Sequence, residues 1–170
     1  ALNATAAAAA AYHAGVSLKQ SAEALRTFAG VKRRLEFLGE INGIKVYDDF
    51  AHHPTAIRLT LEGIRRQIGG ARLIVALEPA SNTMRGMHHV KSLGPALSAA
   101  NNVFLKTSDS IDWNPNDVLD AIAGDGNKAR ASVDHLLKDI REVAKAGDHV
   151  VFMSNRGFDS APHRFVAGEE

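Results

Sequence analysis

The stretch IKVYDDFAHHP, residues 44–54, passes directly from a β-rich run into the start of a helix. Its first part, Ile44 to Phe50, predicts a strand. Pro54 suits the first turn of a helix, where its missing N–H costs no hydrogen bond. One apolar face at helical spacing then runs up to Gly69-Gly70 and is made of Ile57, Leu61, Ile64 and Ile68. A strand that feeds a helix in this way favours an α/β fold.

Two predicted helices open the chain. Residues 1–13 are mostly alanine, the strongest helix former, and they stop before Gly15. Ser17 can cap a second helix that Gly30 closes, with an apolar face of Leu18, Ala22, Leu25 and Phe28. The pattern changes from helix to sheet after these two elements.

Short β-rich runs then alternate with helical patterns to the end of the chain. Leu35 to Ile41 precedes the opening stretch across Asn42-Gly43, a favoured hairpin turn. Further strands are predicted at 73–77, 103–106, 129–133 and 149–153. Helices are predicted between them at 90–100, 118–123 and 134–146. Such alternation predicts an α/β fold, a mainly parallel sheet with helices on both faces.

Composition and charge narrow the function classes. The chain has 170 residues, 45% apolar and 23% charged, which is typical of a globular protein. Lys and Arg number 20 against 19 Asp and Glu, and no long basic run could follow a phosphate backbone, so we expect no nucleic-acid partner. There is no cysteine, and the alanine-rich stretch 4–12 is too short to cross a bilayer. We therefore expect a cytoplasmic protein without a membrane partner.

Three polar stretches follow predicted strands, at residues 48–54, 78–84 and 154–158. Ligands of such sheets bind beyond the carboxyl ends of the strands, so we expect the three stretches to share one rim. Asp48 and Asp49 lie beside two imidazoles, and such a group could bind a ribose, bind a cation or relay a proton. The residue types alone do not distinguish these three functions. The simpler interpretations are a helix cap at Asp49 or His53 and a hydrogen-bonded turn at 81–83.

The segment GVKRRLE at 30–36, followed by VYDDFAHHPT at 46–55, resembles the Mur ligase family in order and spacing. The opening NATAA at 3–7 is similar to the end of that family's central domain, without the His-Asn that begins the family signature. The resemblance covers nearly the whole chain. It implies that residues 1–31 end the central ATPase domain and that residues 32–170 form the Rossmann-like C-terminal domain.

The resemblance also implies ATP-binding roles. By position, Asn3 would contact the adenine and Arg34 a phosphate of ATP. Asp49 would contact the ribose, and His52 would lie near the nucleotide. The chemistry is suitable, because a guanidinium fork matches phosphate oxygens and a carboxylate accepts from ribose hydroxyls. Arg33 could equally read the phosphate, and the charge pattern alone favours a solvated arginine pair at a domain junction.

LEPASNTM at 77–84 and FMSN at 152–155 are most similar to family members that join UDP-N-acetylmuramate to the murein tripeptide L-alanyl-γ-D-glutamyl-meso-diaminopimelate. Members that use L-alanine carry an arginine-bearing segment after the proline that corresponds to Pro79. This chain lacks that segment, so an L-alanine-using member is the second candidate. The resemblance implies substrate contacts by Ser81, Asn82, Thr83, Ser154, Asn155 and Arg156. The tripeptide carboxylates have candidate readers in Arg85, Arg156 and His163, although exposed surface charge is the commoner role. The usual glycine-rich stretch after Ser-Asn is interrupted here by Arg156, Asp159 and Ser160.

The implied reaction forms an amide bond. ATP and Mg²⁺ activate the lactyl carboxylate of UDP-N-acetylmuramate as an acyl phosphate, which the tripeptide amine attacks. The family's phosphate loop and magnesium ligands lie upstream, and no Gly-x-x-x-x-Gly-Lys-[Ser/Thr] pattern occurs here. We therefore expect no certain catalytic residue in this piece, which should be inactive without the upstream domains of the same chain.

A second hypothesis is a stand-alone nucleotide- or metal-binding module on the same sheet. That module would be non-catalytic. A metal site could separately use the histidine pairs at 52–53 and 88–89. These pairs lack the i, i+4 spacing of a known zinc motif, so we predict no metal ligands among them.

Overall fold

The computed structural model of the chain describes residues 2–169. The chain divides into two compact units, Ala1–Val31 and Lys32–Glu170. The first unit holds α1 (Leu2–His13) and α2 (Leu18–Thr27). Ser17 caps α2 as predicted, because its hydroxyl accepts from the N–H of Gln20 while the Gln20 side chain accepts from the N–H of Ser17. None of the helices within the described range is both long and apolar enough to pass through a membrane.

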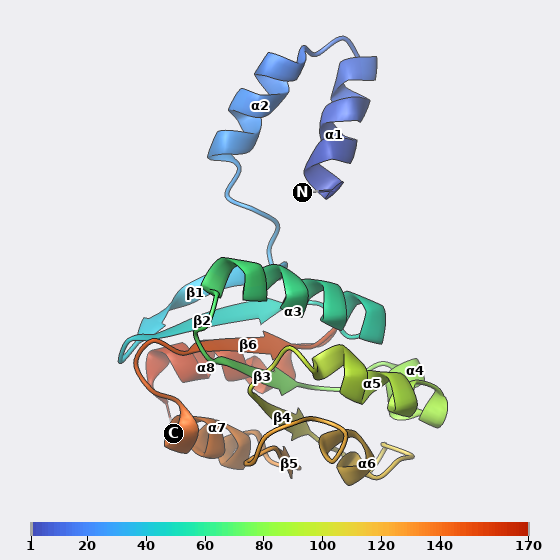
Figure 1. Cartoon of the computed structure of the whole chain (residues 1–170), viewed down its shortest axis with the longest axis vertical. Helices are drawn as coiled ribbons and strands as arrows, with labels where there is room; N and C mark the ends of the chain where they lie inside the picture. The colour runs from blue at the N-terminus through green and yellow to red at the C-terminus, as the bar shows by residue number, and fades with distance from the viewer. Residues whose placement is uncertain (1, 170) are drawn as a thin grey trace. The chain divides into compact units, whose positions relative to one another are not determined.

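The second unit is built on one sheet with the strand order β1-β2-β6-β3-β4-β5, which can be followed in Figure 1. The strands are β1 (Glu36–Ile41), β2 (Ile44–Asp49), β3 (Leu73–Leu77), β4 (Asn102–Lys106), β5 (Lys128–Arg130) and β6 (His149–Met153). β1 is antiparallel to β2 and all other neighbours are parallel, which confirms the mainly parallel sheet. The predicted hairpin turn falls at Asn42 and Gly43, whose φ angles of 51° and 77° suit a type I′ turn.

Helices cover both faces of this sheet. They are α3 (Pro54–Ile68), α4 (Asn82–Arg85), η1 (Met87–His89), α5 (Val90–Leu97), α6 (Pro115–Leu119), α7 (Val133–Val143), η2 (Phe158–Ser160) and α8 (Ala161–Ala167). Successive residues of a strand point to opposite faces. Leu73 and Leu77 of β3 accordingly lie in one buried cluster with residues of α3 and α5, while Ile74 and Ala76 lie in the other with residues of α7 and α8. The predicted α/β fold is confirmed.

Several element boundaries differ from the predictions. The sequence patterns miss α4 and α8, because four and seven residues are too few to show a helical period. The helix expected at 118–123 lies at Pro115–Leu119, because Asn114 caps it and Pro115 takes its first turn. The strand expected at 129–133 ends at Arg130, since Ser132 is already the N-cap residue of α7.

A buried carboxylate holds the edge strand β5 to α7. Asp139 is 7% exposed and pairs with Lys128 Nζ at 2.6 Å and with Arg130 Nε. Burial alone would raise the pKa of Asp139, but hydrogen bonds from Lys128 and Arg130 outweigh it and lower the pKa. A lowered folded-state pKa stabilises the protein above the unfolded-state value, and this stabilisation is lost as the pH falls through the folded-state value.

We expect Asp139→Asn to lower the free energy of unfolding at pH 7 by about 2 kcal/mol, because two partly solvated cations lose their partner. The difference from the wild type should shrink below about pH 4, where the wild-type carboxyl group also becomes protonated. Urea unfolding followed by the fluorescence of Trp113, the only tryptophan, measures both effects. Asp134→Asn is the matched control, since Asp134 pairs with Arg164 while its own side chain is 66% exposed. Equal losses in the two variants would contradict the prediction.

Candidate functional site

The carboxyl ends of β2, β6 and β3 lie next to one another at one edge of the sheet. In the strand register Asp49 pairs with Met153, and Met153 pairs with Leu77. The contact continues beyond the strands, because the N–H of Glu78 donates to the Met153 carbonyl at 2.9 Å and the N–H of Ser154 to the Asp49 carbonyl at 3.1 Å. The expectation of one shared rim is confirmed, since the three polar stretches begin side by side.

Asp49 is buried at this rim and binds backbone groups. The residue is 3% exposed; its Oδ2 accepts from the Leu35 N–H at 2.6 Å and its Oδ1 from the Ala51 N–H at 2.7 Å. Burial raises the pKa of Asp49, and the two backbone hydrogen bonds together with Arg34 oppose this rise without reversing it. The carboxylate thus ties the segment before β1 to the turn after β2.

The two arginines before β1 have different environments. Arg33 Nε donates to Asp48 Oδ2 at 3.0 Å, and Arg33 Nη2 donates to the carbonyls of Ser154 and Arg156, each at 2.7 Å. The side chain of Arg34 is exposed. Over residues 2–169, no hydrogen-bond acceptor or ion-pair partner is placed on the Arg34 guanidinium. The Arg33 guanidinium is therefore used in contacts within the rim, whereas the Arg34 guanidinium is available to a ligand.

The histidines after β2 make local contacts. His52 Nδ1 lies 3.0 Å from the Phe50 carbonyl oxygen. His53 accepts from the N–H of Thr55 as the N-cap of α3, so the cap is His53 and not Asp49. The His53 and His89 rings pack edge to face with 4.6 Å between centroids. The described part of the chain nevertheless holds no group of three or more His, Asp or Glu side chains that could bind a metal ion.

The side chains of the two remaining rim loops divide into buried and exposed groups. Ser154 is 1% exposed; its hydroxyl donates to Glu78 and accepts from the N–H of Arg156. Ser81 caps α4 by accepting from the N–H of Met84, which agrees with the simpler turn interpretation. Of the other predicted substrate contacts, Asn155 is half-buried, and the exposed ones are Asn82, Thr83 and Arg156. Ser154 and Ser81 therefore organise their loops.

A small cavity of about 150 Å³ opens beyond the ends of β3, β4 and β6. It is lined by Glu78, Pro79, Ala80, Arg85, Lys106, Thr107, Ser108, Ser110 and Arg156. Arg85, Lys106 and Arg156 place three cations on its wall, and Glu78 adds the one carboxylate of the lining. Lys106 is absent from the sequence-based predictions, although its position as the last residue of β4 marks it as a rim residue. His163 is exposed on α8 and does not line the cavity.

Two polar atoms near this cavity are buried without a hydrogen-bond partner in the described chain, Arg85 Nε and Asn155 Oδ1. Buried polar atoms are normally paired, and an unpaired one is costly. Both atoms are shielded from solvent, so they reflect the packing of the rim loops and carry no argument for a ligand.

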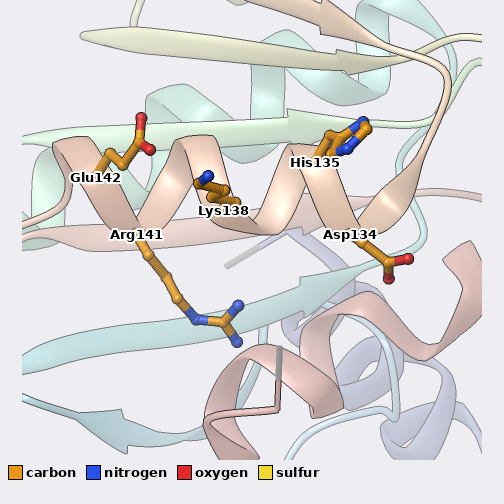
Figure 2. A pocket seen from close by; sticks show the side chains of 5 residues that line it. All are labelled: Asp134, His135, Lys138, Arg141 and Glu142. Atoms are coloured by element: carbon orange, nitrogen blue, oxygen red, sulfur yellow. The ribbon is translucent and has the colours of Figure 1, made fainter.

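A larger hollow, of about 510 Å³, lies along α7. Its lining residues are Asp134, His135, Lys138, Arg141 and Glu142, all from that one helix. Figure 2 shows Glu142 and Arg141 extending to opposite sides of α7. Binding sites bring together polar groups that converge on a ligand, and these do not. The rim is therefore the better candidate site despite its smaller cavity.

Asn3 lies in the first turn of α1, within the unit Ala1–Val31. The other predicted ATP contacts, Arg34, Asp49 and His52, belong to the unit Lys32–Glu170. The four residues thus come from both units, and adenine contact by Asn3 stays a prediction.

In the loop after Asn155, three residues other than glycine adopt the left-handed backbone conformation. Phe158, Asp159 and Ser160 have φ angles of 48°, 47° and 57°. Phe158 is 2% exposed and its ring lies 5.8 Å from the ring of Phe152. Burial of this ring offsets the backbone cost of the left-handed residues. The interruption of the expected glycine-rich stretch is therefore compatible with a tight turn.

The chain resembles known proteins over most of its length. Residues 33–156 match the family model described as Mur ligase, glutamate ligase domain. The chain is 43% identical over 161 residues to the UDP-N-acetylmuramate–L-alanyl-gamma-D-glutamyl-meso-2,6-diaminoheptandioate ligase of Escherichia coli (strain K12), which covers 94% of this chain and 35% of that protein. It is 44% identical over 108 residues to the UDP-N-acetylmuramate–L-alanine ligase of Mycolicibacterium vanbaalenii, which covers 62% of this chain and 22% of that protein.

A solved structure shows the same similarity in three dimensions. The crystal structure of a murein peptide ligase from Psychrobacter arcticus 273-4 is similar to this chain with a TM-score of 0.73 and 40% sequence identity. The similarity covers 97% of this chain and 35% of that one. The chain thus spans about a third of the length of the tripeptide-ligase relatives that it matches.

Proposed function

The chain belongs to the Mur ligase family, and we propose that it is the C-terminal part of an ATP-dependent ligase that joins UDP-N-acetylmuramate to L-alanyl-γ-D-glutamyl-meso-diaminopimelate in peptidoglycan recycling. The observation that carries the proposal is the rim, where an exposed arginine and a cation-lined cavity lie beyond adjoining parallel strands. The tripeptide is favoured as acceptor because the tripeptide-using relative is 43% identical over 94% of the chain, whereas an L-alanine-using relative that covers 89% of the chain is 31% identical. The reaction draws on ATP and a UDP-sugar, so we place the enzyme in the cytoplasm.

The upstream domains complete this enzyme. The chain corresponds to 35% of the tripeptide-using relative and has no phosphate-loop pattern of its own. We propose that the phosphate loop and the Mg²⁺ ligands lie in the upstream domains, and that residues 1–31 are the end of the central ATPase domain. The fragment alone is then inactive.

The rim residues fit a bound nucleotide. ATP, when bound, supplies the phosphoryl group that activates the carboxylate of UDP-N-acetylmuramate. Arg34 is exposed and its guanidinium fork matches phosphate oxygens, so we assign the phosphate contact to Arg34. We do not assign the phosphate contact to Arg33, because three of its N–H groups are used inside the rim. Asn3 is the proposed adenine contact and His52 a neighbour of the nucleotide.

Asp49 supports the nucleotide site chiefly by holding the turn that carries Arg34. Its carboxylate accepts from the N–H of Leu35, the residue next to Arg34, and its 3% exposure leaves little surface for a ribose. The Thr60 hydroxyl also lies 3.5 Å from Asp49 Oδ1, so a ribose contact would use the lone pairs that these three donors leave on the carboxylate.

We propose that the cavity at the ends of β3, β4 and β6 receives the carboxylates of the tripeptide. Such a peptide presents several carboxylates and an ammonium group. Arg85, Lys106 and Arg156 supply charge-assisted donors for the carboxylates, and Glu78 supplies an acceptor for the ammonium. The remaining proposed substrate contacts, Ser81, Asn82, Thr83 and Asn155, stand on the two loops that border the cavity. Ser154 is 1% exposed, so its proposed part is to hold its loop and not to touch the substrate.

The intact enzyme tests the proposed function. It should consume ATP with UDP-N-acetylmuramate and the tripeptide, and mass spectrometry should detect the amide-linked product. Turnover with free L-alanine instead would identify the second candidate, an L-alanine ligase. An upstream reading frame that encodes a phosphate loop supports a ligase, whereas nucleotide binding without any turnover supports the non-catalytic module.

Lys106→Met in the intact enzyme should raise the KM for the tripeptide about tenfold or more, because a hydrogen bond to a charged group is lost. The KM for ATP should change little, because Lys106 lies at the cavity and Arg34 does not. Steady-state kinetics with each substrate varied in turn measure both values. Lys138→Met is the matched control, since Lys138 is an exposed lysine on α7 outside the cavity. An unchanged tripeptide KM in Lys106→Met would remove the cavity from the acceptor site.

A further inference from the structure

Arg33 links two parts of the rim that are 121 residues apart in the sequence. Its Nη2 donates to the carbonyls of Ser154 and Arg156, each at 2.7 Å, and its Nε donates to Asp48 Oδ2 at 3.0 Å. The Arg33 side chain is 27% exposed and that of Asp48 is 7% exposed, so the ion pair is largely shielded from solvent. The two carbonyls flank Asn155, so one guanidinium nitrogen fixes the backbone on both sides of a proposed substrate contact.

The backbone of Arg33 is fixed as well. Its N–H donates to Glu36 Oε2 at 2.7 Å, and its carbonyl accepts from the N–H of Phe50 at 2.8 Å. Arg33 and Leu35 have φ angles of 55° and 49°, so Arg34 stands between two residues in the left-handed conformation. Bulky residues keep such angles only when surrounding contacts enforce them. Movement of Arg33 is therefore transmitted to the turn that presents Arg34.

Both arginine side chains also approach one aromatic ring. The guanidinium carbons of Arg33 and Arg34 lie 5.5 Å and 5.3 Å from the centre of the Phe50 ring. Cations within this distance of a ring are attracted to it. The position of Arg34 thus depends on the ring of Phe50, a residue whose backbone N–H donates to the Arg33 carbonyl.

From these contacts we propose that Arg33 is a positioning residue that couples the phosphate-reading turn at Arg34 to the acceptor-reading loop at 154–156. The inference rests on the proposed function of the rim, because that function gives the turn and the loop their ligands. The planar fork of arginine is required, since one side chain must reach a carboxylate and two carbonyls in fixed directions. The single ammonium of a lysine cannot reproduce all three contacts.

Hydrogen exchange of the 170-residue chain tests the positioning without any substrate. In Arg33→Met the backbone N–H groups of Leu35, Ser154 and Arg156 should exchange at least about tenfold faster, while those of β3 keep their protection. Arg33→Lys should show a smaller increase at the same three groups. Arg58→Met, which breaks only an exposed ion pair with Glu62 on α3, should leave them unchanged. No change at the three groups, or an equal increase throughout the sheet, would overturn the proposal.

Kinetics of the intact enzyme test the coupling. Arg33→Met should raise the KM for ATP and the KM for the tripeptide together, each about tenfold, because misplacement at both subsites weakens both substrates. Arg34→Met should raise only the ATP value, and Arg33→Lys should restore part of both. A rise in only one of the two values in Arg33→Met would overturn the coupling. If the wild-type enzyme does not turn over these substrates, the proposed function fails, and the exchange experiment alone decides whether Arg33 holds the loop.

Discussion

Replacement of Arg34 by Met in the intact enzyme should lower kcat/KM for ATP by about 100- to 1,000-fold, the usual effect of removing one donor to developing charge. The reason is that the guanidinium is exposed and matched to phosphate oxygens, while no acceptor within residues 2–169 occupies it. The stability of the domain should change little for the same reason. ATP-dependent product formation and urea unfolding of the same variant measure the two quantities.

Two further variants serve as controls for the effect of Arg34→Met. Arg34→Lys should lose less activity than Arg34→Met, because it keeps the charge but not the fork. Arg58→Met should keep wild-type activity, since Arg58 pairs with Glu62 on the exposed side of α3. The assignment would be wrong if Arg34→Met kept normal ATP kinetics while Arg33→Met lost only ATP binding, and Arg33 would then be the phosphate reader.

Asp49→Ala should lower the free energy of unfolding of the sheet unit by about 3 kcal/mol, because one buried and one part-buried N–H group lose their acceptor. These are the N–H groups of Leu35 and Ala51, which Asp49 accepts at 2.6 Å and 2.7 Å. Burial raises the pKa of Asp49, so the ionised carboxylate is itself unfavourable here, and its removal offsets part of the loss. Trp113 fluorescence during urea unfolding reports this unit, since Trp113 is the only tryptophan.

The same variant also tests the nucleotide site. The KM for ATP of the intact Asp49→Ala enzyme should rise, because the turn that carries Arg34 loses its anchor at Leu35. Asp49→Asn keeps one acceptor oxygen and should lose less stability than Asp49→Ala. Unchanged ATP kinetics in Asp49→Ala would remove Asp49 from the nucleotide site, whatever its effect on stability.

Local patterns predicted most of the fold correctly. The Asn42-Gly43 turn, the cap at Ser17 and the strand-to-helix passage at 44–54 depend on neighbouring residues, whose conformational preferences act within a few positions. The rim was also predictable, because parallel strands carry their carboxyl ends to the same edge. Short elements such as α4 were not, since four residues show no period.

The sequence by itself determined the family, the parallel sheet and which stretches meet at its edge. Only the tertiary structure decided the surroundings of the side chains at that edge: Arg33 is part-buried and hydrogen-bonded, Asp49 is buried, Arg34 is exposed, and Lys106 lines the same cavity as Arg85. The physical reason is distance along the chain. Arg33 meets the Ser154 carbonyl across 121 residues, and no periodicity or neighbouring preference encodes which of two adjacent arginines turns inward to do so.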